Sequence, residues 1–280
     1  MIINPIDILK IENKELTETL LAPDETDPFV ILNADSIVPV LLVCDHASNR
    51  FPRSLGTMGL DYLNRVSHIA LDIGANAVAE TLADNLGATA VLCQYSRLIV
   101  DCNRELIDDS AFLECSAGVD VPGNNNLQES EKEIRASEIY WPYHNAIKDQ
   151  IVRLKRLGID PVVISIHSFT PVINGNDREW EIGVLWDKDP VTAEIFLTRL
   201  AKAGYLVGDN EPYSGKDPED FTIDYHAESI GLPHVGIEIS QNLINHDDGV
   251  KRVSNILKEI INAYTIPSKP NNIDTQRSLR

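Results

Sequence analysis

Two histidines follow directly on apolar runs of strand length. His46 comes after residues 38–44, and His167 comes after residues 161–166. Catalytic zinc is typically held by three ligands of the His, Glu or Asp type, with a fourth position left open. The two histidines therefore predict a catalytic divalent metal site. The alternative is that each is a hydrogen-bonded histidine at the edge of a sheet.

The third ligand of such a site has several candidates. Asp72, in the segment HIALDIG, is the first choice, and Asp45 and Asn49 beside His46 are weaker ones. Either aspartate could instead orient a ligand histidine by accepting a hydrogen bond from it. A divalent metal lowers the pKa of its water to about 7 and polarises a carbonyl, which is the chemistry that amide hydrolysis needs.

Glu238 interrupts an otherwise apolar run, HVGIEIS. A carboxylate in such surroundings is costly unless it is paired or functional. A general base toward a metal-activated water is the functional interpretation, and a buried ion pair is the alternative.

The segment SRLIVDCNRE places two guanidinium groups beside the predicted site. Arginine binds carboxylates in bidentate fashion, so Arg97, Asn103 and Arg104 are expected to anchor an anionic substrate. Arg104 is also assigned to the catalytic set with Glu238. Arg97 could instead be only a partner of Asp101.

Two further side chains are assigned to substrate binding, Ser168 beside His167 and His144 in a long helix. A serine hydrolase built on Ser168 is not favoured, because the sequence has no Gly-x-Ser-x-Gly elbow. His226 could reach the pocket from a loop, and His68 is expected to be structural or exposed.

The elements that must position these side chains alternate between strands and helices, which indicates an α/β fold with helices on both faces of a mostly parallel sheet. In such sheets, sites form at the carboxyl ends of the strands. Strands are expected at 38–44, 88–93, 98–102, 161–166, 182–186 and 234–239, and helices at 75–86, 129–157 (bent at Pro142), 191–203 and 250–264.

Residues 29–264 are predicted to form a single catalytic domain. Residues 1–28 form an N-terminal extension in which a short helix could pack on the surface, and residues 265–280 are polar and expected to be disordered. The loop-like segment 105–127 is of a length that is usually functional or mobile. The turn-rich loop within 210–220 could cover the site or could simply connect strands.

The charge balance limits the partners. The chain of 280 residues has 24 Lys and Arg against 43 Asp and Glu, a net charge of −19. Nucleic acids and anionic membranes require basic surfaces, so neither is an expected partner. The four cysteines show no CxxC spacing, and no secretion signal or membrane span is recognisable, so a cytoplasmic protein is expected.

With these residues in hand, the chain resembles the N-formylglutamate amidohydrolase (N-formylglutamate deformylase) family over roughly residues 29–264. The resemblance rests on motifs that occur in order: VCDHASNRFP at 43–52, HIALDIGA at 68–75, SRLIVDCNRE at 96–105, WPYHNAI at 141–147, SIHSFTP at 165–171, NEPYSG at 210–215 and GLPHVGIEISQNLI at 231–244.

The resemblance implies a three-layer α/β/α fold with a mixed, mostly parallel central sheet, like that of zinc-dependent exopeptidases, and one zinc ion. The segment VDCNRE resembles the Asp-x-Asn-Arg segment with which metallocarboxypeptidases bind a substrate carboxylate, and Glu238 occupies the place of their general base. Those enzymes use a His-x-x-Glu ligand pair, whereas this chain has His46-Ala47-Ser48-Asn49. Its second ligand must therefore come from elsewhere.

The resemblance also implies hydrolysis of N-formyl-L-glutamate to formate and L-glutamate, as in histidine breakdown. Asp45 before His46 resembles a broader branch of the family, in which the substrate can differ. The alternatives are a zinc carboxypeptidase or cell-wall amidase acting on peptides, and a catalytically inactive ligand-binding domain. A narrow pocket would favour a small anionic N-acyl amino acid, and a homodimer is compatible with any of these.

Overall fold

The computed structural model describes residues 19–173, 175–216 and 220–265. The predictions for residues 1–18 and for the tail after residue 265 lie outside this part of the chain. The described end of the N-terminal extension packs on the body of the same chain: Leu20 is buried, and the backbone N–H groups of Leu20 and Leu21 donate to the carboxylate of Glu138 at 2.9 and 2.8 Å.

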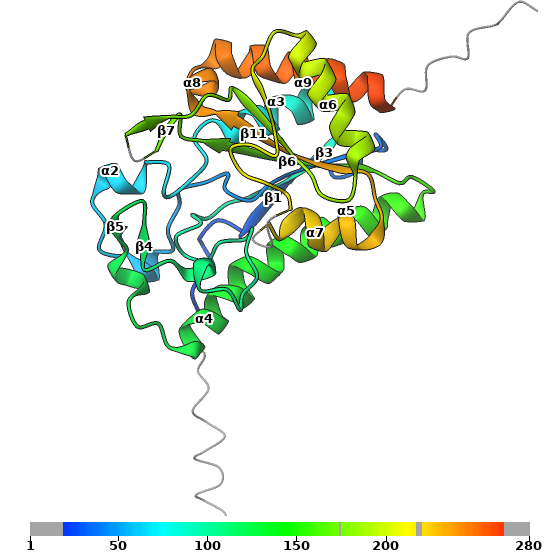
Figure 1. Cartoon of the computed structure of the whole chain (residues 1–280). Helices are drawn as coiled ribbons and strands as arrows, with labels where there is room; N and C mark the ends of the chain where they lie inside the picture. The colour runs from blue at the N-terminus through cyan, green and yellow to red at the C-terminus, as the bar shows by residue number, and fades with distance from the viewer. Residues whose placement is uncertain (1–18, 174, 217–219, 266–280) are drawn as a thin grey trace, which may run out of the picture.

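A seven-stranded sheet in the order β1-β3-β2-β6-β11-β9-β10 forms the centre of the fold (Figure 1). Neighbours β3, β2, β6 and β11 run parallel, as do β9 and β10, whereas β1 and β9 are antiparallel to β3 and β11. The strands are β1 (Phe29–Leu32), β2 (Val40–Cys44), β3 (Thr89–Cys93), β6 (Val162–Phe169), β9 (Ile182–Leu185), β10 (Val207–Asp209) and β11 (His234–Ser240). The predicted mixed, mostly parallel sheet is confirmed.

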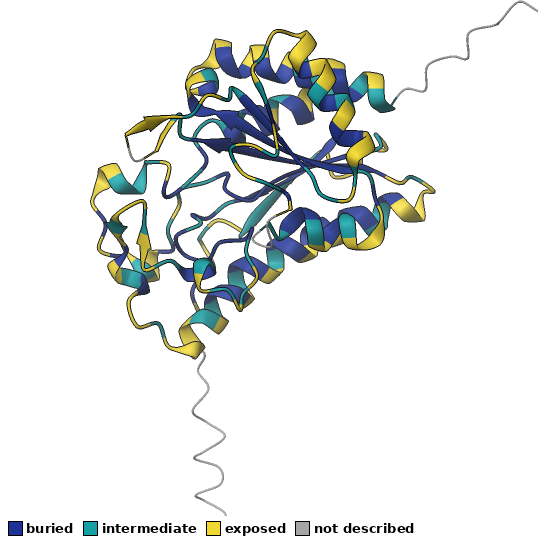
Figure 2. Cartoon of the chain, viewed as in Figure 1, coloured by how far each residue is buried: buried dark blue, intermediate teal, exposed yellow. Residues whose placement is uncertain are grey.

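Helices cover both faces of this sheet because its central strands are apolar on both sides. On β6, Ile164 and Ile166 face one hydrophobic core, while Val163 faces the other. The first core lies under α3 (Ala75–Leu86), α6 (Pro190–Lys202) and α9 (Asp247–Thr265), and the second under α5 (Trp141–Arg156) and α7 (Thr222–His226). Figure 2 shows the strands as a buried layer between helices whose outer sides are exposed.

The predicted strand at 98–102 is wrong. These residues form a turn, and the carbonyl groups of Leu98 and Ile99 accept hydrogen bonds from the side chains of Asn124 and Arg135, at 2.9 and 3.0 Å. A buried backbone must satisfy its polar groups, but side chains can do so as well as a neighbouring strand. An apolar run alone does not distinguish the two cases.

The predicted long helix is present but is not uniform. It consists of α4 (Glu129–Arg135), the π-helical turn η4 (Ala136–Tyr140) and α5. The π-helical turn ends just before Pro142, which has no N–H for an α-helical hydrogen bond. The expected disturbance at Pro142 therefore takes the form of a wider turn.

Four short elements divide the segment 105–127, which was expected to be loop-like. They are η2 (Asp109–Phe112), β4 (Cys115–Ser116), β5 (Val119–Asp120) and η3 (Pro122–Asn124).

The remaining elements of the fold lie outside this segment. They are η1 (Arg53–Leu55), α2 (Tyr62–Arg65), β7 (Val172–Ile173), β8 (Asn176–Asp177), η5 (Glu228–Ile230) and α8 (Gln241–Ile244).

Candidate active site

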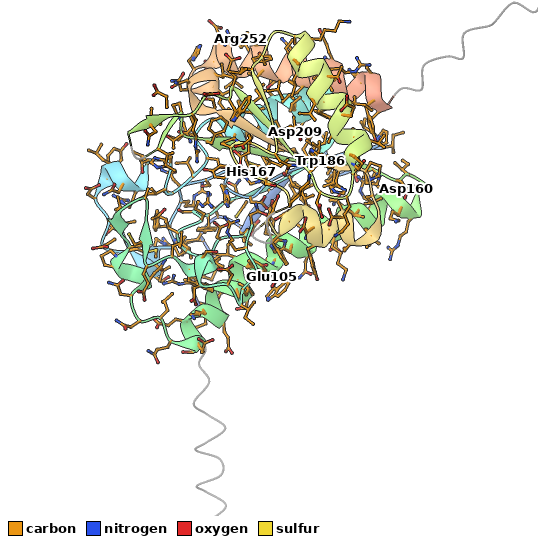
Figure 3. All side chains as sticks on the ribbon, in the orientation of Figure 1. Glu105, Asp160, His167, Trp186, Asp209 and Arg252 are labelled. Carbon is orange, nitrogen blue, oxygen red and sulfur yellow. The ribbon has the colours of Figure 1, made fainter. Side chains whose placement is uncertain are left out.

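Three adjacent strands bring the predicted histidines and Glu238 together. His167 and Glu238 are direct partners in the parallel pair β6–β11, so their side chains point to the same face. His46 lies two residues after β2, the other neighbour of β6. Figure 3 shows His167 near the middle of the molecule, whereas Asp160 and Arg252 lie at its edge. The site is thus buried at the carboxyl ends of the central strands.

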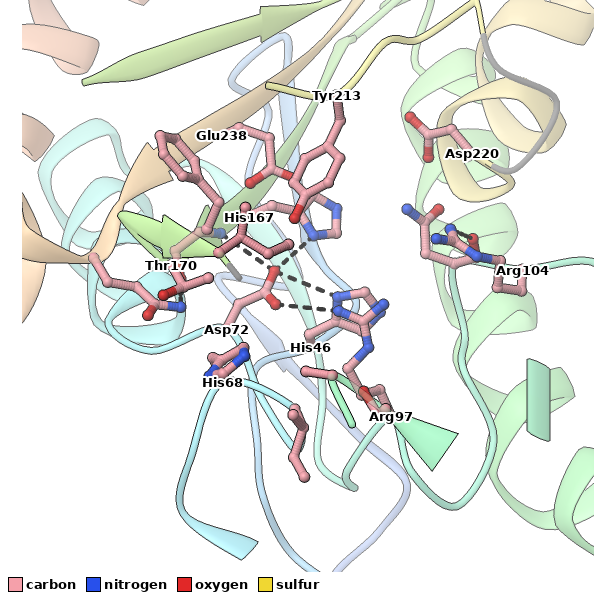
Figure 4. A pocket seen from close by; sticks show the side chains of 18 of the residues that line it. His46, His68, Asp72, Arg97, Arg104, His167, Thr170, Tyr213, Asp220 and Glu238 are labelled. Carbon is pink, nitrogen blue, oxygen red and sulfur yellow. Dashed lines mark hydrogen bonds and ion pairs between the residues drawn. The ribbon is translucent and has the colours of Figure 1, made fainter. Parts of the chain in front are cut away.

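Asp72 joins the two histidines. Its Oδ2 lies 2.9 Å from Nδ1 of His167 and 3.3 Å from Nδ1 of His46, and it also accepts a hydrogen bond from the backbone N–H of Ser168 at 3.2 Å (Figure 4). One ligand atom from each of His46, Asp72 and His167 lies within 4.8 Å of the others. The three predicted ligands therefore form a buried group that could hold a metal ion.

Gly74 lets the Asp72 segment approach the end of α8. It has a φ of +83°, and a Cβ at this position would lie 2.5 Å from the carbonyl oxygen of Ile244. A side chain here would be strained and would clash, so any larger residue would displace the turn that carries Asp72.

A second carboxylate lies behind each histidine ring. His46 donates from Nε2 to Oδ1 of Asp101 at 2.7 Å, and Nε2 of His167 lies 3.1 Å from Oδ2 of Asp45. Thr222 holds Asp45 in turn by donating to its Oδ1 at 2.6 Å. Partners of this kind fix the orientation and tautomer of a metal-binding histidine, and leave both Nδ1 atoms facing the shared carboxylate.

The weaker ligand candidates do not join the group. Asp45 lies behind His167, as the alternative interpretation of an orienting carboxylate predicts. Asn49 is turned away, because its amide donates to the carbonyl of Arg65 at 3.0 Å.

These contacts dominate the protonation of the group. Burial alone would lower the pKa of His167, but its hydrogen bonds to Asp45 and Asp72 raise that pKa well above the usual value. Burial would raise the pKa of Asp45, yet the hydrogen bond and charge of His167 lower it to about 2. For His46, Asp101 and Asp72 outweigh burial and again raise the pKa. Carboxylates and imidazolium groups therefore compensate one another in the metal-free protein.

Glu238 is the buried acid without such compensation. It lines the cavity, its side chain is nearly inaccessible, and its Oε2 has no hydrogen-bond partner among the described residues. Burial raises its pKa to about 7, although the charge of His167 offsets part of this effect. A carboxyl group of this pKa can accept and release a proton near neutral pH, as a general base requires.

Four of the five residues predicted to bind substrate, Arg97, Asn103, Arg104 and Ser168, line the cavity. Arg97 is largely committed to Asp101, to which its Nε and Nη2 donate at 3.0 and 2.6 Å, so the alternative of an ion-pair partner describes it better. Ser168 donates from Oγ to the carbonyl of Ile73 at 2.9 Å. Arg104 also lines the cavity, and its Nη1 donates to the carbonyl of Asn103 at 2.8 Å.

His144 is not on the cavity, which corrects its assignment to substrate binding. Its ring is buried, Nε2 donates to the carbonyl of Cys102 at 2.9 Å, and Nδ1 lies 2.9 Å from Nε2 of His226. Nε2 of His144 carries the proton that it donates to the carbonyl, so Nδ1 of the neutral ring accepts a hydrogen bond from Nε2 of His226. Burial lowers the pKa of His144 to about 4 and that of His226 to about 3.

This pair predicts a specific acid sensitivity. A histidine whose pKa is lowered in the folded state stabilises the protein fully above pH 6.5, and that stabilisation is lost as the pH falls toward the folded pKa. As the pH falls from 6.5 to 5, the free energy of unfolding of His226→Gln should therefore decrease less steeply than that of wild type. The two slopes should differ by up to about 1.4 kcal/mol per pH unit. Denaturant unfolding across this pH range measures the free energy of unfolding of both proteins, and His246→Gln, at an exposed position, is the control. Equal slopes in wild type and His226→Gln would contradict the neutral pair.

The cavity has a volume of about 320 Å³ and is walled by the two predicted covering segments. Segment 105–127 contributes Leu113, Ser116 and Ala117, and segment 210–220 contributes Tyr213, Ser214 and Asp220. Residues of both segments therefore contribute to the cavity wall.

Several polar residues on the cavity wall were missed as site residues, among them His68, Asp220 and Gln241. Burial raises the pKa of Asp220, which Figure 4 shows near Arg104. His68 and Gln241 lie within recognised motifs, at 68–75 and 231–244, whereas Asp220 has no local pattern that would have identified it.

Comparison with known proteins now places the chain. The family model of N-formylglutamate amidohydrolase matches residues 38–245, which include the three strands and the buried group described above. The chain belongs to the N-formylglutamate amidohydrolase family. It is accordingly an amidohydrolase.

Two solved structures are similar to this family member. One, a gene product of Agrobacterium tumefaciens, is 38% identical, has a TM-score of 0.84, and the match covers 86% of this chain and 96% of that one. The other, an N-formylglutamate amidohydrolase from Ralstonia eutropha, is 16% identical with a TM-score of 0.62, covers 84% and 96% of the two chains, and supports the fold alone. No curated protein matches the sequence. None of the described helices is long and apolar enough to cross a membrane.

Proposed function

We propose that the protein hydrolyses the amide bond of a small N-acyl amino acid, with N-formyl-L-glutamate as the leading substrate and formate and L-glutamate as products. The observation that carries this proposal is the unpaired, buried Glu238 beside the group of His46, Asp72 and His167. Membership of the family supports the substrate class. With this substrate, the reaction would serve histidine breakdown.

The residues fit a divalent metal ion. Two histidines and one carboxylate are a donor set of catalytic zinc, and the ring nitrogens that face Asp72 belong to histidines already oriented by Asp101 and Asp45. We propose zinc, held by His46, Asp72 and His167. Bound there, it would lower the pKa of a water to about 7 and polarise the acyl carbonyl.

Glu238 is proposed to move the proton. Its free Oε2 would accept a proton from the attacking water, whose oxygen joins the acyl carbon. The same carboxyl group would then deliver that proton to the nitrogen as the carbon–nitrogen bond breaks, so that an acid and an amine are released. Its pKa near 7 suits both transfers at neutral pH.

Arg104 is proposed to hold a carboxylate of the substrate. It lines the cavity on the side away from Asp72, and Nη1 donates to the carbonyl of Asn103 at 2.8 Å, which orients the guanidinium group. The amide oxygen of Asn103 accepts from the backbone N–H groups of Phe221 and Thr222 at 3.1 and 2.9 Å. The anchoring end of the cavity is therefore built before the substrate enters.

The size of the cavity favours a small substrate over a peptide. A volume of about 320 Å³, closed on two sides by the segments 105–127 and 210–220, is at the lower end for ligand pockets. The alternatives of a carboxypeptidase or cell-wall amidase require a groove that accommodates a longer chain. A non-enzymatic binding domain has no use for an unpaired Glu238.

The test is metal content of the purified protein together with formate release from N-formyl-L-glutamate, before and after chelation. We expect about one zinc ion per chain, with formate release that disappears on chelation and returns with zinc. Metal without release of formate would reject the substrate and retain the hydrolase. Carefully handled protein that neither contains metal nor gains activity with zinc would reject the proposal.

A further inference from the structure

No step of the proposed reaction uses residues 210–215, the NEPYSG motif. These residues form a loop that places Tyr213 on the cavity wall. Figure 4 shows the hydroxyl end of Tyr213 pointing inward, toward His167 and Asp72. Since the side chain is also partly exposed, a substrate in the cavity can contact it directly.

The phenol of Tyr213 is close enough to the catalytic group to affect its charges. Burial lowers the pKa of Arg97, but Asp101, Asp72 and Tyr213 together raise it. Nη1 of Arg97 lies 3.5 Å from Oδ1 of Asp72, the carboxylate that joins the two histidines. The electrostatic effect and Figure 4 therefore agree that the phenol faces this group.

The hydroxyl group of Tyr213 has a proton to donate. Its oxygen accepts a hydrogen bond from Nη1 of Arg178 at 2.9 Å, and a guanidinium group can only donate. Among the described residues, the proton of this hydroxyl has no acceptor of its own. A hydroxyl that accepts from a cation is polarised and becomes a stronger donor. The proton of Tyr213 is therefore available to an oxygen atom in the cavity.

The loop is fixed on both sides of Tyr213. Oδ1 of Asn210 accepts a hydrogen bond from the backbone N–H of Gly215 at 3.0 Å, which closes the loop. The carbonyl oxygen of Glu211 packs so closely on β9 that a Cβ at Gly183 would lie 2.2 Å from it. A donor that is already held in place needs little reorganisation at the moment of reaction.

Three other donors of the cavity wall are already engaged. Ser168 donates from Oγ to a backbone carbonyl at 2.9 Å, and Nε2 of Gln241 donates to the same Oγ at 3.4 Å. Nη2 of Arg97 donates to Asp101 at 2.6 Å. The hydroxyl of Tyr213 thus supplies a donor that these side chains do not.

When water adds to an acyl carbon, the acyl oxygen becomes an oxyanion, and a donor aimed at that oxygen lowers the barrier. We infer that Tyr213 is a catalytic residue whose hydroxyl donates a hydrogen bond to the acyl oxygen as negative charge develops on it, and that Arg178 is the positioning residue that holds this hydroxyl. The proton stays on the phenol oxygen throughout, so no covalent bond of Tyr213 forms or breaks. This inference rests on the proposed function and adds to it a residue that stabilises the transition state.

Replacing Tyr213 by phenylalanine removes the donor and keeps the ring. In Tyr213→Phe, kcat for N-formyl-L-glutamate should fall by about 10²- to 10³-fold, the range for loss of one oxyanion donor, with little change in KM. Tyr62→Phe, at an exposed tyrosine outside the cavity lining, is the matched control and should keep the kcat of wild type. An unchanged kcat in Tyr213→Phe would overturn the inference, whatever the melting temperature of the variant.

A double-variant cycle tests the part played by Arg178. Arg178→Met should lower kcat less than Tyr213→Phe, because the hydroxyl remains but is no longer held. Arg178→Lys, which keeps a donor, should recover part of this loss. The double variant should be no slower than Tyr213→Phe alone, since Arg178 acts only through that hydroxyl. Additive losses would contradict the positioning role.

Binding of a tetrahedral analogue separates this inference from the proposed function. N-phosphoryl-L-glutamate carries anionic oxygens where the oxyanion would form, whereas L-glutamate has no acyl group. Calorimetry on the metal-loaded proteins should show about 10- to 100-fold weaker binding of the analogue to Tyr213→Phe than to wild type, with equal binding of L-glutamate.

The combined outcomes distinguish the two claims. If wild type releases no formate but the difference in analogue binding appears, the proposed reaction fails and the hydroxyl of Tyr213 is still the oxyanion donor. If wild type releases formate and both proteins bind the analogue equally, the reaction stands and the role of Tyr213 is rejected. A wild-type protein that neither releases formate nor binds the analogue would reject both.

Discussion

Replacing Glu238 by glutamine is expected to lower kcat for N-formyl-L-glutamate by about 10²- to 10⁴-fold, the range for loss of a general base. The amide keeps the shape of the side chain but cannot accept a proton from water at Oε2. Metal content should not change, because His46, Asp72 and His167 keep their contacts. Turnover and metal content measured on the same preparation test this expectation.

The same substitution has a predictable effect on stability in the metal-free protein. Burial raises the pKa of Glu238 to about 7, so its stabilising contribution is complete below the unfolded value of 4.5 and is lost as the pH rises through 7. Glutamine does not ionise. Glu238→Gln should therefore gain stability relative to wild type between pH 4.5 and 7. Glu80→Gln, on the exposed side of α3, is the control and should change neither property. A fully active Glu238→Gln enzyme would remove this residue from the mechanism.

Replacing Asp72 by alanine is expected to remove the metal and, with it, the activity. Its Oδ2 is shared by His46, His167 and the backbone of Ser168, so the change leaves three buried donors without their acceptor. Loss of a partner that only orients a ligand weakens metal binding by about 10- to 100-fold, and loss of a direct ligand should exceed this range. Metal titration of the purified variant, followed by elemental analysis, measures the loss.

Asp72→Ala should also destabilise the metal-free protein, by about 3–5 kcal/mol, because it removes one member of a buried charge network. Asp84→Ala is the matched control, because Asp84 is an exposed aspartate in α3, the helix that follows Asp72. Asp72→Asn retains the shape of the side chain and should be more stable than Asp72→Ala. Its metal binding should nevertheless be weak. Normal metal content in both variants would show that the third ligand is a different residue.

Much of the fold could be predicted because its signals are local. The apolar runs that form β2, β6 and β11 have strand length, and glycines follow the helical stripes of α3 and α6. The run 98–102 has the same composition but forms no strand, because Asn124 and Arg135 satisfy its carbonyl groups from far along the chain. Such partners cannot be recognised from the run itself.

The position of the candidate site could be predicted from the sequence because the carboxyl ends of neighbouring parallel strands meet at one edge of the sheet. His46, His167 and Glu238 lie at or near the carboxyl ends of strands that are neighbours in the sheet, and Asp72 was selected for its residue type and motif. His144 lies in an equally polar motif, yet it is paired with His226 behind the cavity. Its placement depends on the packing of α5 against α7, which a helical pattern does not specify.

The sequence by itself determined the family, the order of the elements and the residues able to bind a metal and move a proton. These depend on residue types and on spacing along one strand or helix. Only the tertiary structure decided that Asp45 and Asp101 orient the histidines and that Arg97 is occupied by Asp101. The physical reason is that a charged group is defined by its neighbours, and these neighbours come from segments far apart in the chain.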